Sequence, residues 1–345
     1  MSLRVLVTGA GSGVGQAIAK ALRISELKVD TVFADIDPLN PAFHRGSDSV
    51  LIPRVETPGS LERVIDVIVS STIDVVMIGS VFDMMFFAEN RDTIERETGA
   101  VVVVSSPEVI AMGTDKWLTA EYLREHGLAH PRTIFAGDID KALAEAEDIG
   151  FPLIVKPRYG RASHGVHVIS DTDKLFHALA LIDEPVIQEM ISPPCPELSA
   201  EYTCSFLKLS SGAVLGPFTA RRSLRSGHSW VVEVGVFEDL HPSLHEIAKA
   251  IPCFGPFNVQ LMVGPNGPVP FEFNPRFSGT TAMRAHFGLN EPELILRAER
   301  LNEPVNTPSY ASGMAFRYLE EVFVDGASPQ TLASTGADGI VHDWF

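Results

Sequence analysis

Hard oxygen donors gather near the end of an apolar segment late in the chain. Glu272 and Asn274 alternate there with Phe271 and Phe273. On a strand, this alternation sends the carboxylate and the amide to one face and the two rings to the other. Mg²⁺ prefers oxygen ligands and usually shares them with substrate phosphates. The segment therefore predicts a magnesium edge.

Two further side chains belong to this constellation. Gln260 lies on the preceding apolar segment, and a turn at Asn266-Gly267 would bring it near Glu272 if the two segments pair. Arg276 follows within reach of a transferring phosphate, whose developing charge a guanidinium fork would stabilise. The competing interpretation is a surface carboxylate that forms a salt bridge with Arg276.

A lysine and a glycine-bearing loop lie upstream. Lys156 ends the apolar segment Leu153–Val155, so its stem is anchored while its ammonium faces the loop 158–165. That loop contains Ser163, His164 and Gly165, and its amides, hydroxyl and basic groups suit a lid over phosphates. A solvated loop is the alternative.

A second basic group follows. Arg221, Arg222 and Arg225, with Gly227-His228, are read as a flexible segment between strands. In so acidic a chain, Arg222 is a candidate anchor for a carboxylate or a phosphate, and an exposed loop is the equal alternative.

The glycines at the front of the chain suggest a different chemistry. The loop Gly9–Gly15 joins a strand to a helix, where free amides could hold a pyrophosphate, and Asp35 ends the second strand. The segment resembles the TGxxxGxG turn of short-chain dehydrogenases, which makes an NAD(P)-dependent oxidoreductase the first alternative. No tyrosine precedes a lysine by four residues, so that family's catalytic pair is missing. A tight turn, or a role in holding a second substrate, remains open.

The order of elements predicts three units. Residues 1–112 alternate short apolar runs with amphipathic stretches, which is the βαβ rhythm of a doubly wound parallel sheet. Residues 113–187 read as a small α+β lobe, which opens with a helix capped at Thr114 or Asp115. Residues 188–345 read as a larger, mainly antiparallel lobe.

Composition excludes several classes of protein. The chain has 345 residues, and 44 acidic against 27 basic residues give a net charge of −17, so nucleic acid is not an expected partner. The three cysteines have no paired spacing, which argues against disulfides or a zinc site. No stretch approaches the roughly 18 apolar residues that span a bilayer. We expect a cytoplasmic protein with no membrane partner, and a homodimer is compatible with these data.

The ordered motifs resemble those of the ATP-grasp superfamily, in particular the branch of the carbamoyl-phosphate synthetase large subunit. The resemblance covers nearly the whole chain and rests on Thr114-Asp115-Lys116, Val155-Lys156-Pro157, Ser163-His164-Gly165-Val166, Val186-Ile187-Gln188-Glu189, Glu201-Tyr202-Thr203, Asn258-Val259-Gln260 and Glu272-Phe273-Asn274-Pro275-Arg276. It implies a fold of mixed α/β and α+β class, with a Rossmann-like pre-ATP-grasp domain followed by a two-lobed ATP-grasp fold.

The resemblance also implies a role for each matching position, with ATP and Mg²⁺ (or Mn²⁺) as cofactors. Lys116 and Lys156 would contact phosphates beneath the loop Gly160–Gly165. The implied ligands beyond the phosphates are the hinge residues Gln188, Glu189 and Ile191 for adenine, Glu201 for ribose, Glu272, Asn274 and Gln260 for the metal, and Arg276 for the γ-phosphate or an acyl phosphate.

The expected activity is that of an ATP-dependent ligase, which joins a small carboxylate to an amine or a thiol through an acyl phosphate. The chain has room for one such unit and shows no recognisable glutaminase, so carbamoyl phosphate is a doubtful product. Besides the oxidoreductase, the remaining alternative is a non-catalytic nucleotide-binding protein, which the presence of Glu272, Asn274 and Lys156 disfavours.

Overall fold

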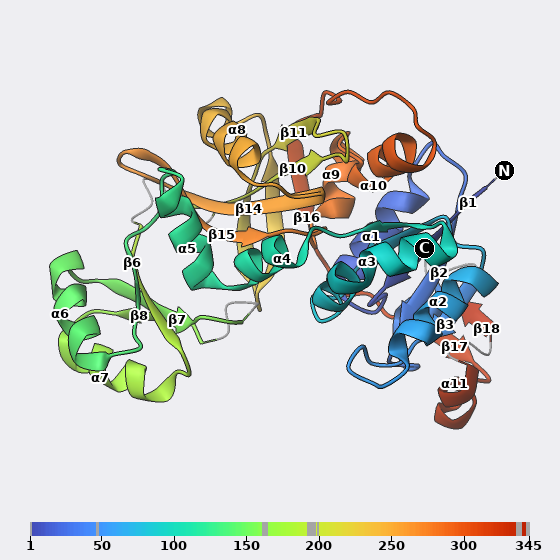
Figure 1. The fold of residues 1–345 in the computed structure, drawn as a ribbon, viewed down its shortest axis with the longest axis horizontal. Coiled ribbons are helices and arrows are strands. Elements are labelled where there is room, and N and C mark those ends of the chain that lie inside the picture. Colours follow the sequence, from blue (N-terminus) through green and yellow to red (C-terminus); the bar gives the residue numbers. More distant parts are fainter. Residues whose placement is uncertain are drawn as a thin grey trace.

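The computed structural model describes residues 2–45, 48–160, 165–191, 198, 200–335 and 340–342. It contains one parallel sheet near the N-terminus, a small four-stranded sheet and a large seven-stranded sheet. The small sheet, with α6 and α7, stands at one end of the elongated molecule (Figure 1). The parallel sheet stands at the other end, and the large sheet lies between them.

The first domain is a five-stranded parallel sheet with the order β3-β2-β1-β4-β5. Parallel neighbours need crossover connections, and helices supply most of them. Its elements are β1 (Leu3–Thr8), α1 (Gly13–Arg23), β2 (Val29–Asp35), the 3-10 turn η1 (Pro41–His44), β3 (Asp48–Leu51), α2 (Ser60–Ser70), β4 (Val75–Ile78), α3 (Met84–Thr98) and β5 (Val101–Val103). The predicted doubly wound sheet is confirmed.

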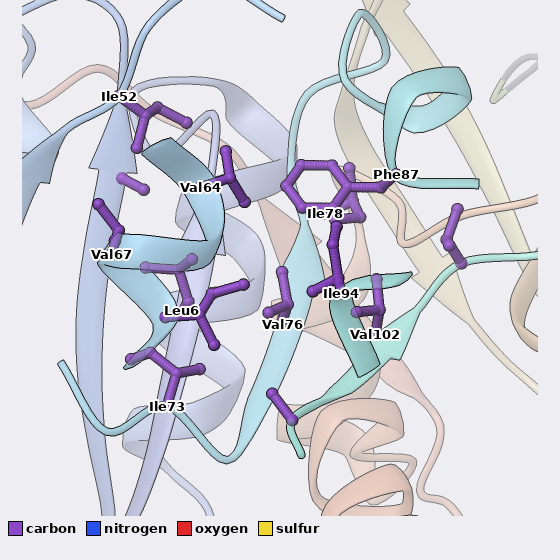
Figure 2. Close-up of a cluster of buried hydrophobic side chains, with 14 of the residues drawn as sticks. Leu6, Ile52, Val64, Val67, Ile73, Val76, Ile78, Phe87, Ile94 and Val102 are labelled. Carbon is purple, nitrogen blue, oxygen red and sulfur yellow. The ribbon is translucent and has the colours of Figure 1, made fainter. Parts of the chain in front are cut away.

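Aliphatic side chains between this sheet and two helices hold the domain together. Leu6, Val76 and Val102 project from three strands toward Val67 of α2 and Phe87 of α3, and all are nearly inaccessible to water (Figure 2). Burying each such side chain contributes about 1.5–3 kcal/mol. This core makes a rigid support for the glycine loop at the carboxyl end of β1.

The small lobe is an antiparallel sheet with the order β6-β9-β7-β8, covered by two helices. Its elements are β6 (Thr133–Phe135), α6 (Ile139–Ile149), β7 (Leu153–Pro157), β8 (His167–Ile169), α7 (Thr172–Leu181) and β9 (Pro185–Glu189). The boundary expected after residue 187 therefore falls within β9, which is an inner strand of this sheet.

The large lobe is built on a sheet with the order β15-β14-β10-β12-β13-β16, with β11 beside β10. Its elements are β10 (Glu201–Lys208), β11 (Val214–Phe218), β12 (Ala220–Arg225), β13 (His228–Val234), the 3-10 turn η2 (Glu238–Leu240), α8 (His241–Ala250), β14 (Gly255–Gly264), β15 (Gly267–Asn274), α9 (Thr281–Phe287), α10 (Glu291–Ile295), the π-helical turn η3 (Leu296–Arg300) and β16 (Gly313–Phe316).

The last described elements return toward the first domain. They are β17 (Phe323–Asp325), α11 (Pro329–Thr335) and β18 (Ile340–His342), and the two strands pair with each other rather than with the large sheet. Figure 1 places them beside β3, and an ion pair of 3.1 Å joins Arg45 to Glu320. Residues 323–335 and 340–342 thus stand apart from the antiparallel lobe in which the range 188–345 placed them.

One face of the large sheet is apolar. Phe257 stacks on Phe206 with 5.1 Å between ring centroids and meets Phe273 edge-on at 5.2 Å. The same cluster includes side chains of α8 and of the connecting helices α4 (Pro107–Thr114) and α5 (Lys116–Glu125). Since residues alternate along a strand, the neighbours of these phenylalanines face the other way, where the polar side chains gather. Within the described residues, no helix is both long and apolar enough to cross a membrane.

Helix α4 also touches the end of β15. A Cβ atom added to Gly113 would lie 2.4 Å from the Pro275 ring. The connection between the first domain and the small lobe therefore packs directly against the segment that follows Asn274, and only glycine allows so close an approach.

Candidate active site

Three strands of the large sheet bring polar side chains to one face. Thr203 of β10 lies opposite Gln260 of β14, and Gln260 lies opposite Glu272 of β15. One pair further along, Asn258 lies opposite Asn274. The chain turns at Pro265-Asn266, one residue earlier than the predicted Asn266-Gly267, and the pairing of Gln260 with Glu272 is confirmed.

Hydrogen bonds link the oxygen donors to Arg276. Asn274 Nδ2 donates to Glu272 Oε1 at 3.0 Å, and Arg276 Nη2 donates to Asn274 Oδ1 at 2.8 Å. Arg276 Nη1 donates to the carbonyl oxygen of Phe277, also at 2.8 Å. In the described chain Arg276 has no carboxylate within salt-bridge distance, which disfavours the surface salt bridge between Glu272 and Arg276.

The prediction that Phe271 and Phe273 lie on the same face was wrong. The β14–β15 register shifts between Gln260 and Leu261, which leaves Phe271 as an extra residue on β15. A bulge of this kind re-aims one side chain. Phe273 is fully buried in the core, whereas the Phe271 ring lies 5.5 Å from Lys156 Nζ. Phe271 therefore lines the site.

Lys156 is buried at the end of β7. The residue is 5 % exposed, and its ammonium donates to Gln188 Oε1 at 2.7 Å. Gln188 in turn donates to Thr133 Oγ1 at 3.0 Å. Burial lowers the pKa of Lys156 to about 8, and the charge of Glu272 only partly opposes this shift. The two lobes thus bring an ammonium and a carboxylate into electrostatic contact across their junction.

Lys116 joins the same group of charges. Its Nζ donates to the carbonyl oxygens of Gly160 at 3.2 Å and Arg158 at 3.4 Å. Burial lowers its pKa, with Glu272 acting in the opposite direction. Asp115 caps α5, as predicted, and also forms an ion pair of 2.7 Å with Arg158.

The loop that Lys116 touches is described only at its two ends. Gly165 has φ +71°, in the left-handed region, and a Cβ atom there would lie 2.9 Å from the Pro157 ring. Ser163 and His164, which were expected to contact phosphates, lie outside the described residues.

Glu201 and Arg222 face each other across β10 and β12 and form a buried ion pair. Arg222 Nη1 also donates to Ser229 Oγ at 3.1 Å. Arg222 was expected in a flexible basic segment, but Ala220–Arg225 is a strand whose pairing with β13 buries this side chain. Its charge is already matched by Glu201, the residue expected to hold ribose.

Sequence reasoning missed Arg317, which follows β16. Its Nε donates to the carbonyl oxygen of Ser229 at 2.9 Å, and its Nη2 donates to that of Gly279 at 2.6 Å. Burial lowers its pKa. Among the described residues it has no acidic partner, and nothing in its sequence neighbourhood marks it.

The hinge residues divide between the lobes. Glu189 donates its backbone N–H to the Arg132 carbonyl at 2.8 Å, and its side chain accepts from Arg132 N at 3.1 Å. That N–H is therefore engaged. Ile191 Cγ2 would lie 3.4 Å from a Cβ atom on Gly264 at the end of β14. The segment 189–191 thus spans the two lobes, as a hinge must.

The front glycine loop uses its amides internally. Asp35 Oδ2 accepts from Gly11 N at 2.8 Å, and its Oδ1 accepts from Ile36 N and Asp37 N at 2.8 and 3.1 Å. A Cβ atom on Gly15 would lie 2.4 Å from the Gly9 carbonyl oxygen. These contacts favour a tight turn, and they leave Asp35 little capacity to bind a ribose.

The donor set at Glu272 fits magnesium. The described chain has no group of three His, Cys, Asp or Glu side chains arranged to hold a metal alone. One carboxylate flanked by the amides of Gln260 and Asn274 suits a cation that takes its remaining ligands from phosphates and water.

Comparison with known proteins agrees with this geometry. The family model described as an ATP-grasp domain matches residues 113–280. This stretch is an ATP-grasp domain. It includes both lysines, the hinge and the complete Glu272–Arg276 segment. The first domain precedes it as a Rossmann-like pre-ATP-grasp domain.

Relatives and solved structures show the same likeness. The chain is 25 % identical over 333 residues to the carbamoyl phosphate synthase large chain of Streptomyces avermitilis, covering 86 % of this chain and 30 % of that protein. The corresponding protein of Mycobacterium sp. is 27 % identical over 195 residues, which are 53 % of this chain. The chain covers only 17 % of that relative's length.

Two solved structures share the fold at low identity. N5-carboxyaminoimidazole synthetase from Staphylococcus aureus, complexed with ADP, has a TM-score of 0.71 at 15 % identity and covers 92 % of this chain and 83 % of its own. Biotin carboxylase from Campylobacter jejuni has a TM-score of 0.69 at 17 % identity, with 90 % and 74 % covered. The ATP-grasp fold with its preceding domain is thereby established.

Proposed function

We propose that the protein is an ATP-dependent ligase that activates a small carboxylate as an acyl phosphate and transfers the acyl group to an amine or a thiol. One observation carries the proposal. Lys116 and Lys156, at the junction with the small lobe, and Glu272, from the large lobe, act on one another electrostatically. One buried and one half-buried ammonium group beside a carboxylate and amide oxygens suit a magnesium-bound triphosphate.

Each side chain then has a role in holding the nucleotide. Lys116 and Lys156 bind phosphate oxygens beneath the Gly160–Gly165 lid, where Ser163 and His164 add contacts. Gln188 orients Lys156, the backbone at Glu189 and Ile191 meets the adenine, and Glu201, steadied by Arg222, meets the ribose. Glu272, Asn274 and Gln260 would hold a magnesium ion, which would neutralise negative charge on the triphosphate.

The carboxylate substrate needs a cation that no acid already neutralises. Arg276 and Arg317 meet this condition among the described residues, since they donate to carbonyl and amide oxygens. Burial and the charges of Arg222 and Arg284 lower the pKa of Arg276 to about 10, so it stays protonated at neutral pH. An anionic substrate or an acyl phosphate would relieve this repulsion.

The reaction takes place in two displacements. A carboxylate oxygen of the substrate attacks the γ-phosphorus in line, and ADP leaves. The amine nitrogen or thiol sulfur then attacks the acyl carbon, inorganic phosphate leaves with the bonding pair of electrons, and the nucleophile releases a proton to water. Exclusion of water by a closed lid protects the acyl phosphate from hydrolysis.

A substrate screen tests this proposal. Amino acids, dipeptides and sugar acids are incubated with MgATP and the full chain, ADP formation is measured and products are identified by mass spectrometry. Glu272→Gln is expected to abolish metal-dependent ADP formation, while Glu121→Gln, at an exposed ion pair on α5, should leave it unchanged. Full activity of Glu272→Gln would refute the metal site.

The same screen separates the alternatives. An oxidoreductase would turn over NAD(P) with a hydroxyl or carbonyl compound and show no ATP affinity. A non-catalytic nucleotide-binding protein would bind MgATP and release no ADP with any substrate pair. The engaged carboxylate of Asp35 speaks against the first alternative.

A further inference from the structure

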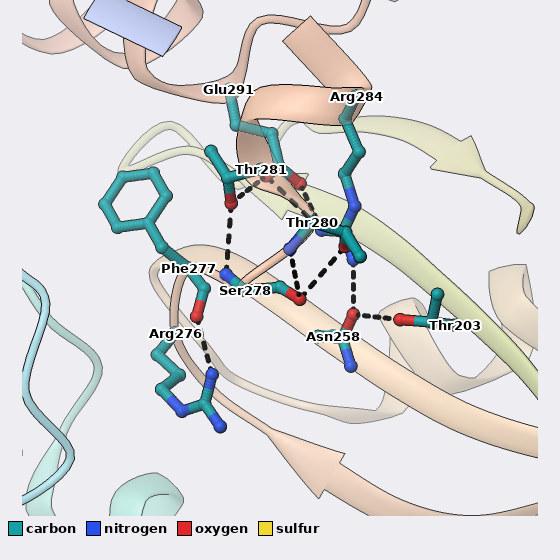
Figure 3. A network of polar contacts seen from close by, with 9 residues as sticks. All are labelled: Thr203, Asn258, Arg276, Phe277, Ser278, Thr280, Thr281, Arg284 and Glu291. Atoms are coloured by element: carbon teal, nitrogen blue, oxygen red, sulfur yellow. Dashed lines mark hydrogen bonds and ion pairs between the residues drawn. The ribbon is translucent and has the colours of Figure 1, made fainter. Parts of the chain in front are cut away.

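A fully buried arginine contacts the polar face of the large sheet. Arg284 of α9 is 0 % exposed, and its Nη1 donates to Glu291 Oε1 at 3.1 Å. Its Nη2 donates to Asn258 Oδ1, which also accepts from Thr203 Oγ1 at 2.9 Å (Figure 3). A charged group in such a position is expensive to bury, so its contacts need an explanation beyond packing.

The chemistry of arginine decides how the Asn258 amide is turned. A guanidinium has only donors, so the atom that it meets must be the amide oxygen. A hydroxyl such as that of Thr203 can donate or accept, and alone it would leave the amide free to turn over. Arg284 therefore fixes Oδ1 toward α9 and directs Nδ2 the opposite way, as Figure 3 shows.

The freed amide nitrogen lies in the proposed site. Asn258 is opposite Asn274 on the polar face, one pair beyond Gln260 and Glu272. The residue is 2 % exposed, and no acceptor for Nδ2 occurs in the described residues. Asn258 Nδ2 is not among the fully buried side-chain atoms that lack a partner, so this N–H keeps contact with solvent and is open to a ligand that supplies an acceptor.

We propose that Arg284 is a positioning residue, which holds the Asn258 amide so that Nδ2 donates to an oxygen of the terminal phosphoryl group of bound ATP. The inference rests on the proposed function. In this proposal Asn258 donates a hydrogen bond to ATP. Its position beside Gln260 and Asn274 would otherwise suggest that its amide is a third amide ligand of the metal. Arg276 approaches the same phosphoryl group from the end of β15.

A purely structural role for Arg284 makes different predictions. In a purely structural role, Arg284 would hold α9 against β14. Its loss would then weaken the binding of all nucleotides equally, or only destabilise the fold. A positioning role affects only the contact with the third phosphate, so its loss would weaken the binding of Mg·AMP-PNP and not that of MgADP. The informative quantity is therefore the ratio of the dissociation constants of MgADP and Mg·AMP-PNP, measured by calorimetric titration of the full chain.

Three variants separate the roles. R284M/E291Q removes the donor to Asn258 without leaving a buried, unpaired glutamate. R284K keeps a side chain that can only donate, so the amide should stay in place. Asn258→Asp retains an oxygen for Arg284 and Thr203 and replaces Nδ2 by a second oxygen.

A hydrogen bond to a charged group changes affinity by about tenfold or more. We expect the preference for Mg·AMP-PNP over MgADP to fall by about tenfold in R284M/E291Q and in Asn258→Asp, and to stay within about twofold of the unmodified protein in R284K.

An unchanged preference in R284M/E291Q would overturn the inference. If that variant does not fold, Asn258→Asp decides in the same way, since its buried contacts are kept. Failure of the unmodified protein to bind either magnesium nucleotide would overturn the proposed function itself and, with it, this inference. Binding of both nucleotides with equal strength would overturn only the inference.

Discussion

The lowered pKa of Lys156 makes nucleotide binding dependent on pH in a calculable way. Its pKa is about 8 in the free protein, because the side chain is buried. A bound triphosphate places negative charge beside the ammonium and restores its pKa toward the ordinary value, near 10.5. Binding above pH 8 therefore requires uptake of a proton, and affinity must fall as pH rises.

The size of the effect follows from linkage. With a free pKa of about 8, half of the lysine is neutral at pH 8 and about nine-tenths at pH 9. The dissociation constant of MgATP should therefore be nearly flat below pH 7, rise about twofold by pH 8 and rise about tenfold by pH 9. Lys116, whose pKa is lowered for the same reason, can only steepen this change.

Calorimetry in two buffers of different ionisation enthalpy measures both the affinity and the protons taken up. We expect about 0.9 proton per nucleotide at pH 9 and about 0.1 at pH 7. Lys156→Arg supplies the control, because a guanidinium keeps its charge throughout this range. The quantity compared is the pH dependence of MgATP affinity, not its absolute value, and we expect this dependence to be much weaker in Lys156→Arg than in the unmodified protein. A flat affinity with no proton uptake in the unmodified protein at pH 9 would refute the reasoning.

Two predictions concern stability. Burial raises the pKa of Asp83 to about 6, so the penalty for ionising it begins near pH 4, where an ordinary aspartate loses its proton, and is complete above pH 6. In urea unfolding, Asp83→Asn should therefore stabilise the protein by about 1–3 kcal/mol at pH 7.5 and by less than about 1 kcal/mol at pH 4. Gly15→Ala would place Cβ 2.4 Å from the Gly9 carbonyl oxygen and should lower the free energy of unfolding by about 3 kcal/mol or more. The control is Gly59→Ala, whose Cβ would meet no atom within 4 Å. Its loss of stability should be about 1 kcal/mol, because the residue has a φ of +83°. Equal losses in the two glycine variants would contradict the steric argument.

The parts of the site that sequence could predict depend on short-range geometry. Glu272 and Asn274 share a face because strand residues alternate, and a tight turn places Gln260 beside them. Asp115 caps a helix because a carboxylate can accept the free amides of the first turn, here those of Trp117 and Leu118. The parallel sheet follows from the rhythm of apolar runs.

The parts that were missed depend on contacts between distant segments. The bulge that turns Phe271 toward Lys156 arises from strand pairing and has no local marker. Gln188 was read as a hinge residue, but its side chain holds Lys156, 32 positions away in the sequence. Arg284 and Arg317 carry no motif, and their importance appears only when α9 packs against the large sheet and β16 joins the edge of that sheet.

The attachment of the small lobe has a mechanical consequence. The ion pair between Asp115 and Arg158 and the bond from Lys116 to Gly160 fasten α5 to the end of β7, only a few residues from Lys156. Helices α4 and α5 themselves belong to the core of the large lobe. A rotation of the small sheet would thus have its axis close to Lys156, and the end of the small lobe farthest from Lys156 would move the most. Access to the candidate site would change greatly, while the lysine proposed to bind the phosphates would stay almost in place.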